Sequence, residues 1–183
     1  QWRAQVAYLP QKPVLLGETV AQAIRLPFTL AIRQSARTKQ GPRRISPTDA
    51  LPDGRIRETL DNMGCADIDL NRPPHDLSGG QAARVSLART LLTRPKVLLA
   101  DEPMSAIDVA ARVRILESFE AIRNAEPDMA IIMVSHDLGV VQHIADRILV
   151  LHDGRAVEVG PTDQVLGHPR DEYTKRLVEA ASL

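Results

Sequence analysis

Short apolar runs alternate with helical patterns in the second half of the chain. Residues 96–100 and 130–134 are almost wholly apolar, which is typical of short strands buried in a parallel sheet. A helix is predicted between them, over 108–125, from apolar residues that recur at helical spacing on the face expected to be buried: Val109, Val113, Leu116, Phe119 and Ile122. This order of strand, helix and strand indicates an α/β fold with a parallel sheet.

The same patterns predict the other elements. Strands are expected at 5–9 and at 147–151 and 155–159, the last two joined as a hairpin through Asp153-Gly154. Helices are expected at 18–33 with a break at Pro27, at 55–63, from the N-cap Ser78 to about Arg94, near 138–145 and at 171–181. Residues 34–54 are polar, with three prolines and two glycines, and are expected to form a solvated loop.

Composition and charge exclude several classes of protein. The 183 residues carry 23 Lys and Arg against 23 Asp and Glu, and this balance argues against nucleic acid as a partner. One cysteine, Cys65, excludes an internal disulfide framework and a Cys-rich zinc site. No apolar run reaches the ~18 residues that span a bilayer, and the start lacks the apolar region of a secretory signal. The chain also lacks an initiating Met, so we expect the natural protein to start upstream of Gln1.

Leu77-Ser78-Gly79-Gly80-Gln81 is the strongest local motif and opens a predicted helix. A helix N-terminus offers unpaired N–H groups and the positive end of the helix dipole. Two glycines allow close approach of a ligand and Ser78 adds a hydroxyl, so the segment could bind a phosphate. Taken alone, an N-cap serine followed by flexible glycines is the simpler interpretation.

Asp101 and Glu102 end the apolar run at 97–100. Two acids at the carboxyl edge of a parallel sheet lie where ligands bind in open α/β folds. Asp101 could hold Mg²⁺, which prefers oxygen ligands beside substrate phosphates, and Glu102 could polarise an attacking water. Two solvated acids in a turn are the alternative.

Two more polar residues follow predicted strands. His136 comes after the run at 130–134 and could contact a phosphate or position water, although a lone histidine is more often an ordinary surface residue. Gln11 lies in a loop bounded by Pro10 and Pro13 and could coordinate Mg²⁺ or orient water. By itself this glutamine has little meaning.

Together these motifs resemble the nucleotide-binding subunit of ATP-binding-cassette (ABC) transporters. LSGGQ at 77–81 matches the family signature, VLLADEP at 97–103 resembles its Walker B strand, and SAID at 105–108 its D-loop. VSHD at 134–137 is similar to the H-loop and YLPQ at 8–11 to the Q-loop. The resemblance implies a P-loop NTPase-like α/β core, a mostly parallel sheet flanked by helices, with a helical subdomain.

The resemblance also implies roles for individual residues. Glu102 would be the general base, His136 would hold the γ-phosphate of ATP, and Asp101 and Gln11 would serve Mg²⁺. In this family two nucleotide-binding domains enclose two ATP molecules. The residues expected to face the partner domain, in a homodimer or heterodimer, and its ATP are Ser78, Gly79, Gly80, Gln81 and Asp108. Transmembrane permease subunits would hold the chain at the cytoplasmic face of the membrane as a peripheral protein.

The implied domain organisation is the end of a core strand plus the Q-loop at 1–17, a helical subdomain at 18–76, the signature and ATPase core at 77–167, and a helical tail at 168–183. The family's P-loop, G-x-x-x-x-G-K-[ST], is absent from the sequence. We therefore expect a fragment that lacks the N-terminal strands of its domain. The complete domain would hydrolyse ATP, whereas this chain alone would bind ATP weakly and turn it over negligibly.

Substrate and function class stay open at this point. Residues 10–28 resemble ATPases linked to metal or iron export, while 168–180 resemble the tail of peptide or nickel importer ATPases. A non-transport ABC ATPase is one alternative, although such proteins tend to carry long coiled coils, zinc cysteines or a second cassette. A non-hydrolysing cassette module is the other, supported only by the missing P-loop.

Overall fold

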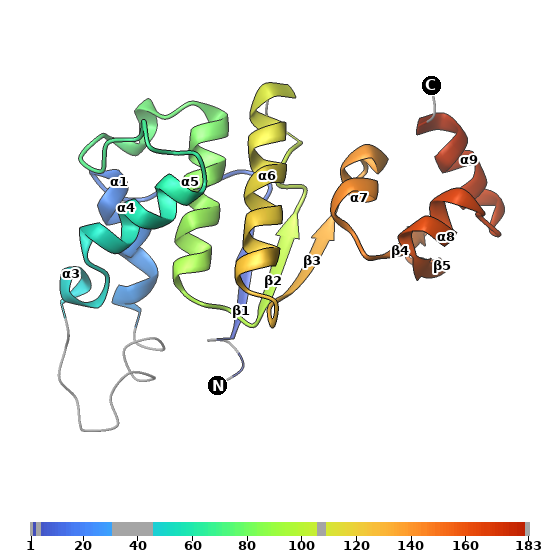
Figure 1. Cartoon of the computed structure of the whole chain (residues 1–183), viewed down its shortest axis with the longest axis horizontal. Helices are drawn as coiled ribbons and strands as arrows, with labels where there is room; N and C mark the ends of the chain where they lie inside the picture. Colours follow the sequence, from blue (N-terminus) through green and yellow to red (C-terminus); the bar gives the residue numbers. More distant parts are fainter. Residues whose placement is uncertain (1, 3–4, 31–45, 106–108, 182–183) are drawn as a thin grey trace. The chain divides into compact units, whose positions relative to one another are not determined.

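The computed structural model describes residue 2 and residues 5–30, 46–105 and 109–181. It divides into two compact units, Gln1–Val134 and Ser135–Leu183, which Figure 1 shows as the blue-to-orange and orange-to-red parts of the chain. Each unit is considered by itself. The domain boundaries expected from the sequence stay predictions.

A parallel sheet forms the centre of the first unit. Its strands are β1 (Val6–Leu9), β2 (Val97–Asp101) and β3 (Ala130–Val134), in the order β1-β2-β3. Both pairings are parallel, and Leu9, Ala100 and Met133 share one row across the sheet. The predicted α/β fold with a mostly parallel sheet is thereby confirmed.

Two helices cover one face of this sheet. Helix α5 (Gly79–Leu92) and helix α6 (Val109–Ala125) run side by side along the strands (Figure 1). Leu9, Leu98 and Ala100 face these helices and are buried. On the opposite face Tyr8 and Ile132 each remain 57% exposed.

The expectation that 130–134 is a fully buried strand was therefore wrong. Alternate residues of β3 are exposed, and Val134 is 57% exposed. Successive side chains of a strand point to opposite faces, and α5 and α6 cover only one of them. An apolar run of five residues cannot reveal which face is covered.

The predicted face of α6 was partly wrong. Val109 and Val113 are 75% and 50% exposed, although both were expected in the core. The buried stripe instead consists of residues spaced as i, i+3, i+4 and i+7, which are Ile115, Ser118, Phe119 and Ile122. Because both sets fit a helical period, only the position of the sheet selects between them.

A group of short helices packs beside α5. They are α1 (Val20–Arg25), the 3-10 helix η2 (Leu26–Thr29), α3 (Pro47–Ala50), α4 (Asp53–Asn62) and the 3-10 helix η3 (Pro74–Asp76). Their buried side chains include Ile24, Ile56 and Leu60, and Ile68, between α4 and η3, is buried as well. Contacts join α1 and α4 to α5, so this group extends the core of the first unit.

Two predictions in this region are confirmed only in part. The break expected at Pro27 is confirmed, because helix α1 begins at Val20 and ends at Arg25, and Pro27 lies in the tighter turn η2. No α-helix follows in residues 26–30, and residues 31–33 lie outside the described residues. The loop expected at 34–54 lies outside the described residues up to position 45. Its described part is not a loop throughout, since α3 begins after the N-cap Ser46 and α4 begins at Asp53.

The second unit contains a hairpin and three helices. Helix α7 (Leu138–Ile144) precedes strands β4 (Arg147–His152) and β5 (Arg155–Pro161), and α8 (Thr162–Gly167) and α9 (Glu172–Ala181) follow. Asp153 and Gly154 both have positive φ, 48° and 72°, as a two-residue hairpin turn requires. The predicted hairpin and last helix are confirmed, whereas α8 was not predicted.

Glu158 of β5 caps the start of α9. Its carboxylate accepts hydrogen bonds from the backbone N–H groups of Arg170 at 3.1 Å and Asp171 at 3.1 Å. Desolvation opposes ionisation and would raise the pKa of Glu158, but these N–H groups, together with the Thr174 hydroxyl and the positive charge of Arg170, outweigh it and hold the pKa below its ordinary value. The ionised carboxylate therefore stabilises the folded tail.

Replacing Glu158 with Gln is expected to lower the melting temperature at neutral pH. Because the folded pKa is lowered, the stabilisation is complete above about pH 4.3, the ordinary pKa of a glutamate. It is lost as the pH falls through the lowered pKa. Thermal unfolding at pH 7 and pH 3 should show a difference between wild type and variant that shrinks in acid. Glu179→Gln in α9 is the control, and an unchanged difference at both pH values would contradict the prediction.

Candidate functional site

Polar residues gather at the carboxyl edge of the parallel sheet. Asp101 is the last residue of β2 and Glu102 follows it, while Gln11 lies two residues beyond the end of β1. Since β1 and β2 are parallel neighbours, both segments leave the sheet at the same edge. Ser105 joins them, because its hydroxyl accepts a hydrogen bond from Gln11 Nε2 at 2.9 Å.

Glu102 has a strained and well-anchored backbone. Its φ is 43°, a left-handed conformation that non-glycine residues seldom adopt. Its N–H donates to the Val134 carbonyl at 2.9 Å. Its own carbonyl accepts from the N–H and the hydroxyl of Ser105, at 3.2 and 3.1 Å. Strain of this kind is tolerated where surrounding contacts hold it, and it is concentrated at functional sites.

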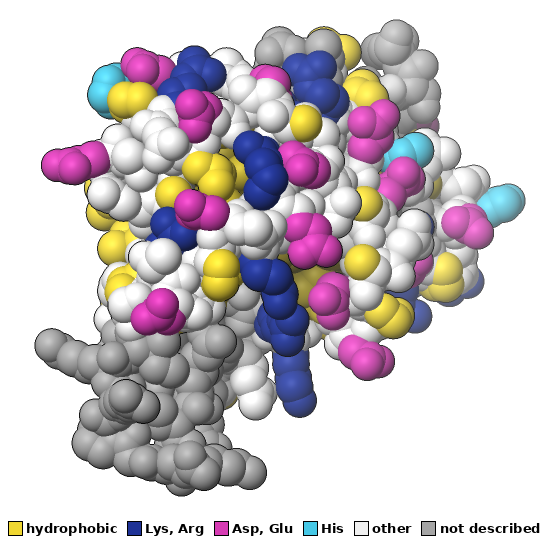
Figure 2. Space-filling model, turned by 60° about the vertical axis from the view of Figure 1, so that its left-hand side comes forward, with side chains coloured by type: hydrophobic (Ala, Val, Ile, Leu, Met, Phe, Trp, Pro, Cys, Tyr) yellow, Lys and Arg dark blue, Asp and Glu magenta, His cyan; other side chains and the backbone are white. Residues whose placement is uncertain are grey.

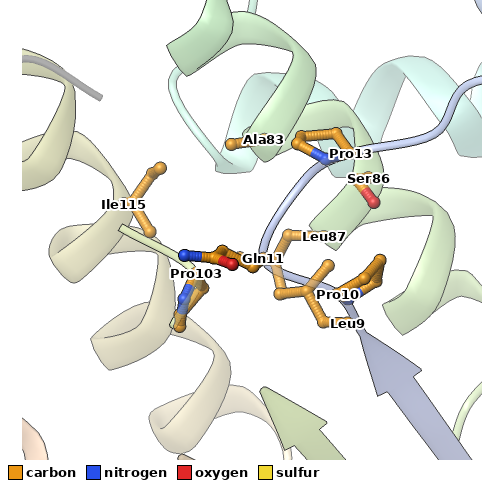
Figure 3. A pocket seen from close by; sticks show the side chains of 9 residues that line it. All are labelled: Leu9, Pro10, Gln11, Pro13, Ala83, Ser86, Leu87, Pro103 and Ile115. Carbon is orange, nitrogen blue, oxygen red and sulfur yellow. The ribbon is translucent and has the colours of Figure 1, made fainter. Parts of the chain in front are cut away.

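A small cavity of about 10 Å³, room for about one water molecule, borders Gln11. Figure 3 shows the Gln11 side chain beside Pro103, between α5 and α6. The lining is mostly apolar and consists of Leu9, Pro10, Gln11, Pro13, Ala83, Ser86, Leu87, Pro103 and Ile115. The loop of residues 10–13, called the Gln11 loop, therefore lies against apolar side chains of the core.

Tyr8 is a site residue that sequence reasoning missed. Its phenol donates a hydrogen bond to Asp101 Oδ2 at 2.8 Å. This bond, with desolvation and the carboxylate charge, raises the pKa of the Tyr8 phenol. Tyr8 pairs with Leu99, two residues before Asp101, so both side chains lie on the same face of the sheet. Period-two alternation puts Tyr8 on one face of β1, but only the register of β1 against β2 brings it to Asp101.

Arg89 of α5 was also missed. Its guanidinium donates to the Val14 carbonyl at 2.8 Å, next to the Gln11 loop, and to Ser86 Oγ at 3.3 Å. Burial lowers the pKa of Arg89, which nevertheless keeps its charge at neutral pH. An arginine in an amphipathic helix normally predicts a solvated position, so no local signal identifies this contact between helix and loop.

The predicted signature segment begins α5. Ser78 Oγ accepts from the Gln81 N–H at 3.2 Å, and the Ser78 N–H donates to Gln81 Oε1 at 3.0 Å. These reciprocal bonds form a capping box. Gln81 Nε2 also donates to Asp67 at 2.8 Å, while Gly79 is exposed and Gly80 buried. The predicted N-cap is confirmed, and the proposed binding role stays a prediction.

Two of the predicted site residues remain, His136 and Asp108. His136 is exposed and belongs to the second unit, two residues after β3 ends. The adjacent Asp137 caps α7, accepting from the N–H groups of Gly139 and Val140 at 3.0 and 3.2 Å. Asp108 lies outside the described residues.

On the face shown in Figure 2, acidic and basic side chains are interspersed instead of forming regions of one sign. Within the described ranges, no three His, Cys, Asp or Glu side chains are grouped so that they could hold a metal ion. None of the described helices is both long and apolar enough to cross a bilayer.

Comparison with known proteins agrees with this geometry. The family described as "ABC transporter" matches residues 1–105. The chain is 41% identical over 133 residues to the dipeptide transport ATP-binding protein DppF of Lactococcus lactis, covering 73% of this chain and 42% of that protein. It is 33% identical over 168 residues to the oligopeptide transport ATP-binding protein OppF of Salmonella typhimurium, covering 92% of the chain and 45% of that protein.

A third relative is the glutathione import ATP-binding protein GsiA of Escherichia coli O1:K1 / APEC. It is 36% identical over 184 aligned residues, which cover 97% of this chain and 27% of that protein. The chain thus spans less than half the length of each of these curated relatives. The family match covers more than half of the chain, and it includes the signature segment, the acids at the end of β2 and Gln11. The chain belongs to the ABC transporter family.

Proposed function

We propose that this chain is part of a subunit that binds and hydrolyses ATP to drive transport across a membrane. The observation that carries the proposal is the position of Gln11, Asp101 and Glu102 at one edge of a parallel sheet, where Ser105 links Gln11 to the main chain of Glu102. Ligands of open α/β folds bind at this edge. The relatives are named as ATP-binding transport proteins, which does not favour a non-transport ATPase or a non-hydrolysing module.

Mg²⁺ fits the donor set at this edge. Asp101 and Gln11 offer a carboxylate and an amide oxygen, and Mg²⁺ prefers oxygen ligands. This ion usually keeps several waters and takes substrate phosphates as ligands, so one or two protein oxygens suffice. Once bound, Mg²⁺ would neutralise part of the phosphate charge.

Glu102 is proposed as the general base that accepts a proton from the attacking water. Its anchored backbone would keep the carboxylate in place during the reaction. His136 is proposed to donate a hydrogen bond to the γ-phosphate, a role that suits an imidazole near neutral pH. Gln11 would contact the metal and the water.

The signature segment is proposed to bind the ATP of a second nucleotide-binding domain. A helix of 14 residues begins there, and its N-terminal N–H groups favour an anion. Ser78, Gly79 and Gly80 would contact the phosphate, with Gln81 nearby and Asp108 at the domain interface. The domain ranges given above, from 1–17 to 168–183, belong to the same proposal.

The transported substrate is proposed to be a short peptide, moved inward. Three relatives are named for dipeptide, oligopeptide and glutathione transport, all of which are peptides or peptide-like. This agrees with the likeness of 168–180 to importer tails more than with the likeness of 10–28 to exporters. Transmembrane permease subunits would hold the chain at the cytoplasmic face as a peripheral protein.

The test measures phosphate release from ATP by the intact protein, produced from its complete coding sequence with its permease subunits. Hydrolysis should require Mg²⁺, and Asp101→Asn should raise the Mg²⁺ concentration needed for half-maximal rate by roughly tenfold or more, because a charged metal ligand is lost. Asp128→Asn, in an exposed turn, is the matched control. Hydrolysis that needs no divalent ion, or no hydrolysis at all, would contradict the proposal.

Substrate class needs its own measurement. Membrane vesicles that contain the assembled transporter should accumulate labelled short peptides when ATP is supplied on the side of the ATP-binding subunit. Metal chelates serve as the competing substrate class. Accumulation of the chelates without the peptides would overturn the peptide assignment and leave the ATPase assignment intact.

A further inference from the structure

We propose that Ser105 is a positioning residue that decides which end of the Gln11 amide is available to a metal ion. The proposal rests on the proposed function, because it adds to Gln11's expected role toward Mg²⁺. It arises from two hydrogen bonds at one hydroxyl, which link the Gln11 loop to the main chain of Glu102.

The Ser105 hydroxyl has a single proton to donate. Ser105 Oγ lies 3.1 Å from the Glu102 carbonyl oxygen. A carbonyl can only accept, so Ser105 must donate its proton there. The same oxygen can then only accept from Gln11, and the partner at 2.9 Å is accordingly the amide nitrogen Nε2.

Ser105 is therefore bonded to the nitrogen of the Gln11 amide and not to its oxygen. Mg²⁺ binds oxygen and not an amide NH₂ group. If the amide were reversed, its oxygen would meet an acceptor at Ser105, and its NH₂ group would become the available end. The hydroxyl thus disfavours the orientation that cannot bind a cation.

Ser105 and Gln11 both lie in segments with a constrained backbone. Ser105 is fixed to Glu102 by its backbone N–H as well, at 3.2 Å, and Glu102 is tied to Val134. Pro10 and Pro13 restrict the backbone of the Gln11 loop. The hydrogen bond between Gln11 and Ser105 therefore joins two constrained segments, and little conformational freedom is lost when it forms.

The first readout does not depend on catalysis. In ¹⁵N-labelled intact protein, the side-chain NH₂ protons of Gln11, assigned by their loss in Gln11→Ala, should exchange with solvent faster in Ser105→Ala than in wild type. Ser105→Thr keeps a hydroxyl and should restore slow exchange. Ser118→Ala is the matched control, because the Ser118 hydroxyl also donates to a main-chain carbonyl, at 2.8 Å within α6.

The second readout is the affinity for Mn²⁺, used in place of Mg²⁺ for its spectroscopic signal, in the presence of an ATP analogue that is not hydrolysed. Ser105→Ala should weaken Mn²⁺ binding by roughly 3- to 10-fold, the range expected for one lost hydrogen bond. Ser105→Thr should stay within about twofold of wild type. The variant Gln11→Glu carries no NH₂ group and should gain affinity when Ser105 is also changed to Ala, because two acceptors no longer meet.

These outcomes separate the inference from the proposed function. Equal NH₂ exchange and equal Mn²⁺ affinity in wild type and Ser105→Ala would overturn the positioning role. The positioning role would also be overturned if Ser105→Thr lost as much Mn²⁺ affinity as Ser105→Ala, because the threonine variant keeps a hydroxyl. A wild-type protein that hydrolyses no ATP would refute the proposed function, while the exchange measurement would still report on the amide.

Discussion

Glu102→Gln in the intact protein is expected to reduce ATP turnover by roughly 10²- to 10⁴-fold, the usual contribution of a general base. Glutamine is nearly isosteric with glutamate but cannot accept a proton from water at neutral pH. The backbone contacts of Glu102 to Val134 and Ser105 do not involve its carboxylate, so the site should keep its shape. Phosphate release and ATP binding, measured on the same preparation, check the prediction.

The affinity for ATP shows whether turnover falls because the general base is lost or because ATP no longer binds. The variant should bind ATP about as tightly as wild type, and bound ATP should stabilise a dimer because it is no longer consumed. Glu126→Gln, an exposed residue just beyond α6, makes the same chemical change away from the site and should leave turnover intact. Turnover in Glu102→Gln at more than a tenth of the wild-type rate would show that Glu102 is not the base.

Phe119→Ala is expected to destabilise the intact protein by about 3–5 kcal/mol, the usual cost of removing a buried phenylalanine. Phe119 is only 2% exposed and lies in the middle of the buried stripe of α6. The loss combines the transfer free energy of the ring with the cavity that it leaves. Urea-induced unfolding gives the change in the free energy of unfolding.

Val113→Ala is the matched comparison, because the sequence pattern placed Val113 on the same face as Phe119. In the structure Val113 is 50% exposed, and its replacement should cost less than about 1 kcal/mol. Equal losses for the two variants would mean that α6 buries Val113 as well as Phe119, on the face expected from the sequence.

The positions of the main elements could be read from the sequence because their signals are local. Ser78 caps α5 through contacts within three residues, and Asp153-Gly154 supports its turn through its own backbone angles. Apolar runs mark β2 and β3 in the same way. The order of the motifs was sufficient to indicate the family, since each motif is a short stretch whose residue types depend on the chemistry expected of it.

The wrong or missing predictions concern features that depend on distant parts of the chain. Which face of α6 and which side of β3 are buried depends on where the sheet and the helices lie. The predicted and the observed stripes of α6 both fit a helical period. Tyr8 and Arg89 were missed for the same reason, because their partners Asp101 and Val14 are 93 and 75 positions away.

The sequence by itself therefore determined the family, the parallel α/β architecture and the residue types at the carboxyl edge. Only the tertiary structure decided how those residues are held. Gln11 and Ser105 are 94 positions apart, and the left-handed φ of Glu102 depends on contacts with Ser105 and Val134. Local preference acts over a few residues along the chain, whereas hydrogen bonds between distant segments form only once β1, β2 and β3 are side by side.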